Sequence, residues 1–398
     1  MRLLPFHYAA RNIGRSPLRM WLTVGGAAIV VFLVVAAVAS MRALDRGVRD
    51  SGTPGNVMLL GAGSEESVER SEIPASTPGV IAASVAGLRA LAGAPLISPE
   101  LHVALPLRRD GTPPPSGSAR DLVLVRGIEA SAFLVHPQAR LVCGRVPEAG
   151  ADEAVVGQAL AARLGISAGD IGTAAGPPVV LIDDRPHTVT GIFHAPGVAI
   201  DGEAWMPITD LLVQTRRQTI SAVVVSLGPT ADIADLEVFA ARRPDLELSA
   251  VEETAYYAGL ASFFGPVRAL VGLSALLVAA GAMLGGLNAL DAAFAARARE
   301  IAMLQVLGFS RYAVVVSLVQ ESVITAAAGA LPAIVAAFAL LDGAGVQFSM
   351  GIFALSVDAT CVAWGLVAAV ALGLVGSLPP AIRCMRTPIP QSLKSDLA

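Results

Sequence analysis

Lysine is almost absent from this sequence of 398 residues, and Lys394 is the only one. A phosphate-binding P-loop needs a lysine after its glycine-rich turn, because that side chain reaches the terminal phosphates of a nucleotide. Leu393, not glycine, precedes Lys394, so this sequence contains no P-loop. The Gly-x-Ser-x-Gly pattern of serine hydrolases and the His-Glu-x-x-His pattern of zinc proteases are missing too. We therefore expect no catalytic residue, cofactor site or metal site in this chain.

Cysteine and charge are also scarce. Cys143 is the only cysteine between residues 42 and 265, so no intrachain disulfide can form within that segment. Charged residues make up 15% of the chain, against about 25% in a typical soluble domain. Hydrophobic residues make up 54%, which excludes a disordered chain. The net charge of −4 leaves no electrostatic footprint for nucleic acid, so we expect no nucleic-acid partner.

Four long runs without charge account for the apolar composition. They cover residues 20–41, 269–290, 322–341 and 359–382. Because an α-helix rises about 1.5 Å per residue, roughly 20 residues cross the hydrocarbon core of a bilayer. The first run also resembles a signal peptide, but residues 1–19 in front of it and its own length are too long for one. We therefore expect an α-helical membrane protein with four transmembrane helices, one followed by three.

Charges next to these runs predict their orientation, since positive residues flank the cytoplasmic ends of transmembrane helices. Basic residues lie before the first run, between the second and third, and after the fourth: Arg2, Arg11, Arg15, Arg19; Arg297, Arg299, Arg311; Arg383, Arg386 and Lys394. The loop between the third and fourth runs carries Asp342 and Asp358 and no basic residue. We therefore expect a multi-pass protein of the cell (inner) membrane with both termini in the cytoplasm and a large domain outside it.

The expected organisation follows from these two patterns. It comprises a cytoplasmic elbow helix (1–19), transmembrane helix 1 (20–41), an extracytoplasmic domain (42–265), transmembrane helix 2 (266–290), a cytoplasmic loop (291–311), transmembrane helix 3 (312–341), an extracytoplasmic loop (342–358), transmembrane helix 4 (359–382) and a cytoplasmic tail (383–398).

The large outer segment has the mixed pattern of a two-lobed α+β domain inserted between helices 1 and 2. Runs rich in Val, Ile and Leu predict strands at 56–60, 101–107, 121–126, 179–182, 187–193 and 221–227. Apolar residues at three- and four-residue spacing predict helices at 80–91, 153–164 and 231–242. A Gly- and Pro-rich loop at 111–118 and a break at 194–197 delimit a middle lobe at about 118–195.

A few polar residues of this domain allow two interpretations. Asp183-Asp184 is predicted to form a hairpin turn rather than a catalytic carboxylate pair, because turns favour Asp. His187 and His194 flank one predicted strand, and a metal-binding pair is the less favoured alternative.

Within the membrane segments, two features are candidates for helix packing. Gly281-x-x-x-Gly285 would allow another helix to approach closely. Glu321 follows Arg311 on the third membrane helix, and a carboxylate at membrane depth is a candidate functional residue because burying its charge in a membrane is costly. A packing or salt-bridge residue near the interface is the alternative to a proton-carrying one.

The cytoplasmic loop carries the most specific pattern in the sequence. From Arg297 to Ser310 it reads Arg-Ala-Arg-Glu-Ile-Ala-Met-Leu-Gln-Val-Leu-Gly-Phe-Ser, and Gln320-Glu321 follows. It resembles the permease family that includes MacB, the lipoprotein-release subunits LolC and LolE, and FtsX. That family reads Arg-x-x-Glu-Ile-x-x-Leu-x-x-x-Gly, then a helix carrying Glu. The matching positions are Glu300, Ile301, Leu304, Gly308 and Glu321.

Three other stretches extend the resemblance over nearly the whole chain. Residues 11–23 resemble the N-terminal elbow and first span of the family, residues 144–192 its periplasmic core domain, and residues 380–389 its C-terminal end. The tail departs from the family pattern, because Leu393 stands five residues after Pro388 where the family usually has Leu after four.

The resemblance implies a permease subunit of an ABC transporter, with a MacB-like periplasmic core domain and an FtsX-like transmembrane domain. Such a subunit couples ATP hydrolysis by a separate ATPase to export or extraction of substrate outside the membrane, by mechanotransmission. ATP and Mg would be held by the ATPase. The resemblance also implies a homodimer or a heterodimer with a second permease in the lipid bilayer. An extracytoplasmic adaptor protein or hydrolase is a further implied partner.

The resemblance also implies which residues would contact the ATPase. The apolar stripe would be Ile301, Leu304 and Leu307, ending at Gly308. Its polar rim would be Arg297, Arg299 and Glu300.

Three other functions compete with this one. An FtsX-like regulator would use the same transmission to switch an extracytoplasmic cell-wall enzyme. A membrane receptor is disfavoured because the cytoplasmic segments are too short for an output module. A proton-driven transporter is disfavoured by four spans with a single membrane carboxylate, Glu321, and no inverted repeat.

Overall fold

The computed structural model describes residues 17–112, 122–172, 176–348 and 351–386. Most of the expected elbow helix (1–19), part of the loop at 111–118 and most of the tail at 383–398 lie outside them. The chain divides into two compact units. One contains residues 1–41, 266–344 and 355–398, and the other contains residues 42–265 and 345–354.

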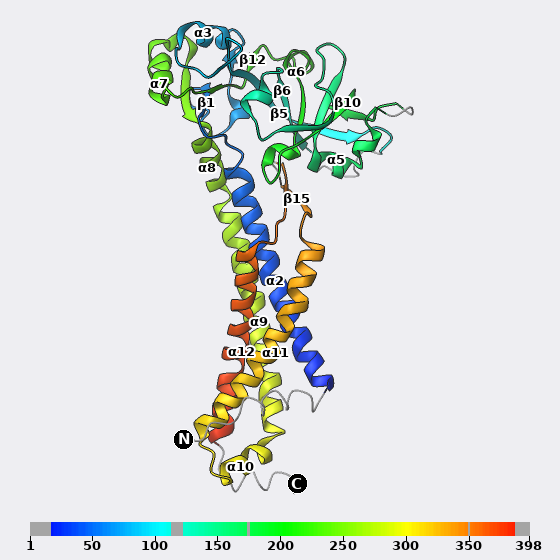
Figure 1. The fold of residues 1–398 in the computed structure, drawn as a ribbon, viewed down its shortest axis with the longest axis vertical. Helices are drawn as coiled ribbons and strands as arrows, with labels where there is room; N and C mark the ends of the chain where they lie inside the picture. Colours follow the sequence, from blue (N-terminus) through cyan, green and yellow to red (C-terminus); the bar gives the residue numbers. More distant parts are fainter. Residues whose placement is uncertain (1–16, 113–121, 173–175, 349–350, 387–398) are drawn as a thin grey trace. The chain divides into compact units, whose positions relative to one another are not determined.

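The first unit consists of long apolar helices (Figure 1). They are α2 (Pro17–Arg49, whose last turns belong to the second unit), α9 (Gly265–Ala295), α11 (Arg311–Leu340) and α12 (Ala359–Arg386). Over the described residues, each is long and apolar enough to cross a membrane. The short helix α10 (Ala298–Val306) lies between α9 and α11 in the sequence.

Small residues bring the helices of this unit together. A Cβ atom added to Gly329 of α11 would lie 2.6 Å from the carbonyl oxygen of Val24 in α2. A Cβ atom added to Gly373 of α12 would lie 2.7 Å from the Cα atom of Val323 in α11. Both approaches need glycine, because no side chain fits between backbones at these distances.

The second unit is an α+β domain built on a ten-stranded mixed sheet. The strand order is β14-β1-β13-β5-β6-β11-β8-β10-β7, and β9 pairs with both β10 and β5. The bounds are β1 (Asn56–Gly61), β5 (Ile97–Arg109), β6 (Leu122–Ile128), β7 (Arg140–Gly144), β8 (Glu153–Gly157), β9 (Val179–Ile182), β10 (Arg185–His194), β11 (Ala204–Pro207), β13 (Ala222–Ser226) and β14 (Leu248–Glu252).

Shorter elements surround this sheet. The helices are α3 (Thr77–Ser84), α4 (Ala132–Val135), α5 (Gln158–Leu164), α6 (Ile208–Thr215), α7 (Ile233–Arg242) and α8 (Glu253–Phe263). The 3-10 helices are η1 (Val68–Arg70), η2 (Ala168–Asp170), η3 (Ala199–Gly202) and η4 (Pro244–Leu246). The strand pairs are β2 (Ile73–Pro74) with β12 (Thr219–Ile220), β3 (Ala90–Leu91) with β4 (Ala94–Pro95), and β15 (Gly345–Phe348) with β16 (Gly351–Ala354).

Strand β5 is shared by two parts of the sheet. Its residues 97–100 pair with β13, and its residues 101–106 pair with β6. We call β14, β1 and β13 the β1 half. We call β6, β11, β8, β10 and β7 the β8 half, together with α4 and η3, whose Ala132 and Ile200 pack in one core with Val155 of β8. The main core runs through both halves and includes Leu101 of β5. A smaller aromatic core around Phe193 and Trp205 lies in the β8 half.

Several predicted elements of this domain are confirmed and two are wrong. The strand predicted at 179–182 has those bounds as β9, and Asp183-Asp184 forms the predicted hairpin turn to β10. The helix predicted at 153–164 begins only at residue 158, because residues 153–157 form the buried central strand β8. The helix predicted at 80–91 ends at Ser84. A short apolar run does not distinguish helix from strand by its spacing, so neighbouring strands decide.

His187 and His194, which both lie within β10, have separate partners. Nδ1 of His187 lies 3.0 Å from the carbonyl oxygen of Arg185. Nδ1 of His194 lies 3.2 Å from a carboxylate oxygen of Asp201. Over the described residues, no group of three potential metal ligands forms around either of them.

Candidate functional site

Helix α10 and the residues that flank it carry the pattern of residues 297–310. It begins after Arg297 and ends at Val306. Gly308 follows with φ +91°, a left-handed conformation that glycine adopts without strain. The amide of Phe309 donates to the carbonyl oxygen of Leu304 at 3.2 Å, and that of Gly308 to Gln305 at 3.0 Å. These two bonds form a Schellman motif, so Gly308 ends α10 and turns the chain toward α11.

An ion pair joins the start of α10 to α11. Nη1 of Arg297 lies 3.1 and 3.2 Å from the two carboxylate oxygens of Glu321. Nε of Arg297 lies 3.4 Å from Glu300. The side chains of Arg297 and Glu321 are 17% and 19% exposed, so water screens this pair less than a surface pair. Glu321 therefore pairs with Arg297, and the helix-packing role expected of Glu321 stays a prediction.

The apolar residues of α10 point in two directions. Ile301 is buried and Leu304 half-buried, and both pack in a cluster with Phe294 of α9, Val314 of α11 and Met385 of α12. The side-chain amide of Gln305 also contacts the sulfur of Met385 at 3.3 Å. One face of α10 is therefore held against three other helices.

The other face of α10 is exposed. The exposed fractions of Met303, Val306 and Leu307 are 51%, 67% and 76%. Arg299 and Glu300 are exposed as well. Of the stripe expected from the resemblance, only Leu307 lies fully on this face. The assignment of these residues to an ATPase interface stays a prediction.

The Gly281-x-x-x-Gly285 pattern does not bring two helices of this chain together. Among the described residues, no atom lies within 4 Å of a Cβ added at Gly281 or Gly285, apart from α9 itself and the chain neighbours. Gly285 instead lines a hollow of about 510 Å³ between α2, α9, α11 and α12. A packing role for this pattern therefore needs a second chain and stays a prediction.

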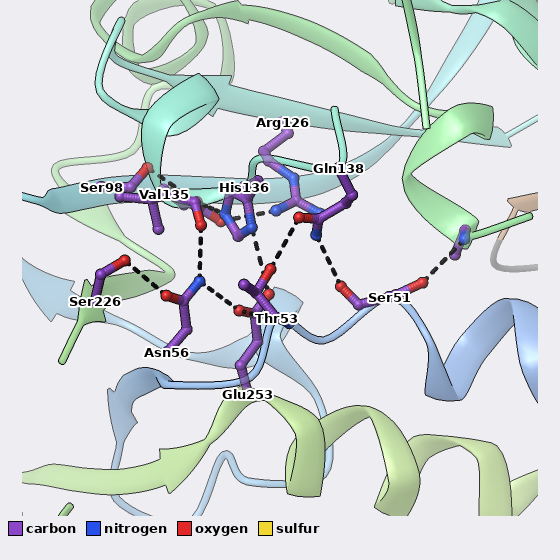
Figure 2. A network of polar contacts seen from close by, with 12 residues as sticks. Ser51, Thr53, Asn56, Ser98, Arg126, Val135, His136, Gln138, Ser226 and Glu253 are labelled. Atoms are coloured by element: carbon purple, nitrogen blue, oxygen red, sulfur yellow. Dashed lines mark hydrogen bonds and ion pairs between the residues drawn. The ribbon is translucent and has the colours of Figure 1, made fainter. Parts of the chain in front are cut away.

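The second unit contains a buried network of charged side chains that sequence reasoning missed (Figure 2). Its centre is Glu100 on β5. One carboxylate oxygen accepts from Nε2 of His136 at 2.6 Å, and the other lies 2.9 Å from both Nη1 of Arg126 and Nε2 of His102. All four side chains are fully or almost fully buried. Charges at such depth are stable only when paired and hydrogen-bonded.

Arg126 extends the network into the β8 half. Its guanidinium donates two hydrogen bonds to Glu203, at 2.8 and 2.7 Å. Nε1 of Trp205 donates to the same carboxylate at 2.7 Å. The guanidinium also lies over the Trp205 ring, 5.4 Å from its centroid. A bidentate Arg–carboxylate pair fixes both orientation and distance, so β6 is joined rigidly to the segment that enters β11.

Glu253, the first residue of α8, extends the network in the other direction. Its Oε1 lies 3.4 Å from Nδ1 of His136, an ion pair without a close hydrogen bond. Its Oε2 accepts from the side-chain amide of Asn56 at 2.8 Å and from the backbone amide of Thr53 at 3.2 Å. A Cβ added to Gly52 would lie 2.8 Å from the carbonyl oxygen of Glu253. The chain that follows α2 therefore lies directly against the start of α8.

Neighbouring polar contacts tie the same segment to the β8 half (Figure 2). The side chain of Gln138 accepts from the Thr53 hydroxyl at 2.9 Å and donates to the carbonyl oxygen of Ser51 at 3.2 Å. The hydroxyl of Ser51 accepts from the backbone amide of Ala199 at 3.0 Å.

The charges of the network shift the pKa values of its members. Burial alone would lower the pKa of His136, but the carboxylates of Glu100 and Glu253 raise it to about 10. Burial alone would raise the pKa of Glu100, but His136 and Arg126 hold it well below its ordinary value. His136 is therefore an imidazolium between two carboxylates at neutral pH.

One signal in the sequence points to this network. Glu100 and His102 stand two residues apart in a run that is otherwise apolar, so they share one face of β5. Two polar residues on the buried face of a strand need partners. The partners lie on other elements far along the chain, and spacing alone does not name them.

Comparison with known proteins places the chain in a family. Residues 20–238 match the model of the MacB-like periplasmic core domain, and residues 272–389 match the model of the FtsX-like permease C-terminal domain. No curated protein matches this sequence.

Solved structures resemble the chain over about half its length. The crystal structure of the periplasmic region of MacB from Actinobacillus actinomycetemcomitans has 11% identity and a TM-score of 0.39, covering 52% of this chain and 92% of that one. The crystal structure of the extracellular domain of the noncanonic ABC-type transporter YknZ from Gram-positive bacteria has 11% identity and a TM-score of 0.35, covering 49% and 99%.

The four apolar helices and the two family matches define a membrane permease with an extracytoplasmic domain. The chain belongs to the MacB/FtsX-type family of ABC transporter permeases. Members of this family work with ABC ATPase partners.

Proposed function

We propose that this permease couples ATP hydrolysis by a separate ATPase subunit to work on a substrate outside the membrane, export or extraction. In this arrangement both termini and α10 lie in the cytoplasm, consistent with the basic residues around them. ATP and Mg are bound by the ATPase, since this chain has no P-loop. Motion passes through the helices to the α+β domain, so no substrate has to cross through this chain.

The observation that carries this proposal is the division of α10 into two faces. The exposed face presents Met303, Val306 and Leu307, and large exposed apolar side chains grouped on one helix are typical of a protein interface. The buried face is fixed to α9, α11 and α12 through Ile301 and its cluster. A partner that grips the exposed face therefore moves three long helices together.

The ion pair between Arg297 and Glu321 supports the same role. It joins α10 to α11 about three turns inside the latter helix, where charge separation would be costly. Displacement of α10 by a partner is therefore transmitted to α11 instead of being absorbed by the connecting turn.

The test is purification of the tagged full chain from its native membrane, with identification of copurifying proteins. An ATPase with a P-loop is expected with the wild-type chain. Leu307→Arg and Met303→Arg should abolish copurification while the chain still inserts in the membrane, because each buries an unpaired charge in the proposed interface. Val213→Arg is the matched control, since Val213 is 74% exposed on α6 in the other unit.

Retention of the ATPase by both α10 variants would contradict the proposed interface. The alternative role, regulation of an extracytoplasmic cell-wall enzyme, uses the same ATPase contact. It is distinguished by a copurifying cell-wall hydrolase in place of a transported substrate.

A further inference from the structure

The buried network ties together the two chain segments through which the α+β domain continues into apolar helices. Residues 51–56 follow α2, which ends at Arg49. Glu253 begins α8, and only Phe264 separates α8 from α9. We propose that Glu253 and His136 are positioning residues that clamp these two segments to the β8 half, so that displacement of either segment reaches that half. This inference rests on the proposed function and names the residues that would transmit motion within the α+β domain.

The contact between the two segments is close and directional. The amides of Thr53 and Asn56 both donate to one oxygen of Glu253. Gly52 leaves no room for a side chain against the backbone of Glu253 and Thr254. Movement of one segment along the other would break hydrogen bonds to a buried carboxylate, which costs far more than sliding between apolar surfaces.

The contact from these segments to the β8 half also consists of buried polar groups. The second carboxylate oxygen of Glu253 faces His136, which ends α4, and His136 faces Glu100 on β5. The side-chain amide of Asn56 donates to the carbonyl oxygen of Val135, one residue before His136. Ser51 is bound in the same region by two further hydrogen bonds. The side-chain amide of Gln138 donates to its carbonyl oxygen (Figure 2), and the backbone amide of Ala199 donates to its hydroxyl oxygen.

The imidazolium is the centre of this arrangement because it has a carboxylate on each ring nitrogen. Two elements distant in sequence, β5 and α8, are thus joined through one side chain. Apolar packing would fill the same space, but it would not fix the relative orientation of the three elements. The network therefore supplies the rigidity that transmission needs.

The matched set of variants starts with Glu253→Gln. A glutamine keeps the size of the side chain and an oxygen that accepts from Asn56 and Thr53, but it removes the charge that faces His136. Gln138→Ala removes the bonds to Ser51 and Thr53 without stranding a buried charge, so it tests the clamp should Glu253→Gln fail to fold. Asp245→Asn is the control, because it removes an exposed ion pair with Arg243 in the same domain.

The experiment is hydrogen–deuterium exchange on the full chain with its copurified ATPase in lipid nanodiscs, with and without ATP and vanadate. In the wild type, nucleotide should change exchange both at residues 51–56 and at α4. In Glu253→Gln and Gln138→Ala, the nucleotide-dependent change in exchange at residues 51–56 should persist. The nucleotide-dependent change in exchange at α4 should fall on the order of tenfold, because one buried contact between the two segments and α4 is weakened. The rate of ATP hydrolysis in the two clamp variants should match that of the wild type. The control Asp245→Asn should show the same nucleotide-dependent exchange as the wild type.

A nucleotide response at α4 that is unchanged in both variants would overturn the clamp and leave the proposed function standing. A wild-type chain without any nucleotide response, or without a copurifying ATPase, would overturn the proposed function and the clamp with it. A purely structural role for the network would raise exchange without nucleotide and leave the nucleotide-dependent difference intact, which also contradicts the proposal.

Discussion

Nε2 of His136 lies 2.6 Å from Oε1 of Glu100, and both side chains are completely buried. The pair joins the end of α4 to the first part of β5, and Glu253 on the far side of the imidazole makes it a three-member charge chain. Its ionisation couples the stability of the domain to pH.

Replacement of His136 by glutamine should change that pH dependence. The folded pKa of His136 is about 10, above its ordinary value of 6.5, so its charge stabilises the fold fully below pH 6.5. This stabilisation declines as pH rises from 6.5 to 10. Glu100 has a lowered pKa, so its contribution is complete above its ordinary value of 4.5 and falls away in acid. The thermal unfolding midpoint of the wild type, measured in detergent, should therefore exceed that of His136→Gln by the largest amount between pH 4.5 and pH 6.5. A constant difference up to pH 10 would contradict the assigned charge of His136.

Removal of the Arg126 charge should destabilise the domain strongly. Arg126→Met leaves Glu203 and Glu100 without their common partner, and removal of one member of a buried ion pair costs about 3–5 kcal/mol. The exposed pair of Arg243 and Asp245 is the control, and Arg243→Met should change stability by no more than about 0.5 kcal/mol. Chemical denaturation followed by tryptophan fluorescence measures both, since Trp205 lies in the network. Equal losses in the two variants would show that the buried network adds no particular stability.

Gly329 of α11 and Gly281 of α9 should respond differently to substitution by leucine. Gly329→Leu forces a side chain into the backbone of α2 and should cost at least about 1–3 kcal/mol, so less folded chain accumulates. Among the described residues, a Cβ atom added to Gly281 meets no atom within 4 Å outside α9 itself and the chain neighbours, so Gly281→Leu should leave folding unchanged. If α9 pairs with a second permease through this pattern, Gly281→Leu should weaken that association in crosslinking experiments. If Gly281→Leu folds and crosslinks as completely as the wild type, the Gly281-x-x-x-Gly285 pattern does not lie in the dimer interface.

The ion pair of Arg297 and Glu321 should act as one unit in coupling. Arg297→Gln and Glu321→Gln should each lower the ATPase activity that the assembled complex shows, and the double variant should lose little more than either one. Exchange of the two residues, Arg297→Glu with Glu321→Arg, should recover part of the activity. Additive losses in the double variant would indicate that the two side chains act independently.

Much of the fold could be predicted from hydropathy and charge. Long uncharged runs favour helices long enough to cross a membrane, and α9, α11 and α12 begin and end within a few residues of the ranges predicted for them. The turn at Asp183-Asp184 was predictable because turn residues act locally. The strand at 153–157 was not, since an apolar run beside a helix has the same spacing in either state and only neighbouring strands make it β8.

Part of the candidate site could likewise be predicted from the sequence, and part was decided by the tertiary structure. The pattern at residues 297–310 alone pointed to α10, because its residues are contiguous and their order is characteristic. Which of its apolar residues face outward was decided by the cluster around Ile301, which buries one face and leaves Met303, Val306 and Leu307 exposed.

The sequence by itself determined that the chain has four apolar helices and an α+β domain, that it lacks a P-loop, and that residues 297–310 carry the pattern of a permease family. Only the tertiary structure decided that Glu100, His136 and Glu253 form one charge chain. Their positions are far apart in the sequence, and a buried charge selects its partner by proximity and desolvation, which exist only once the sheet has formed.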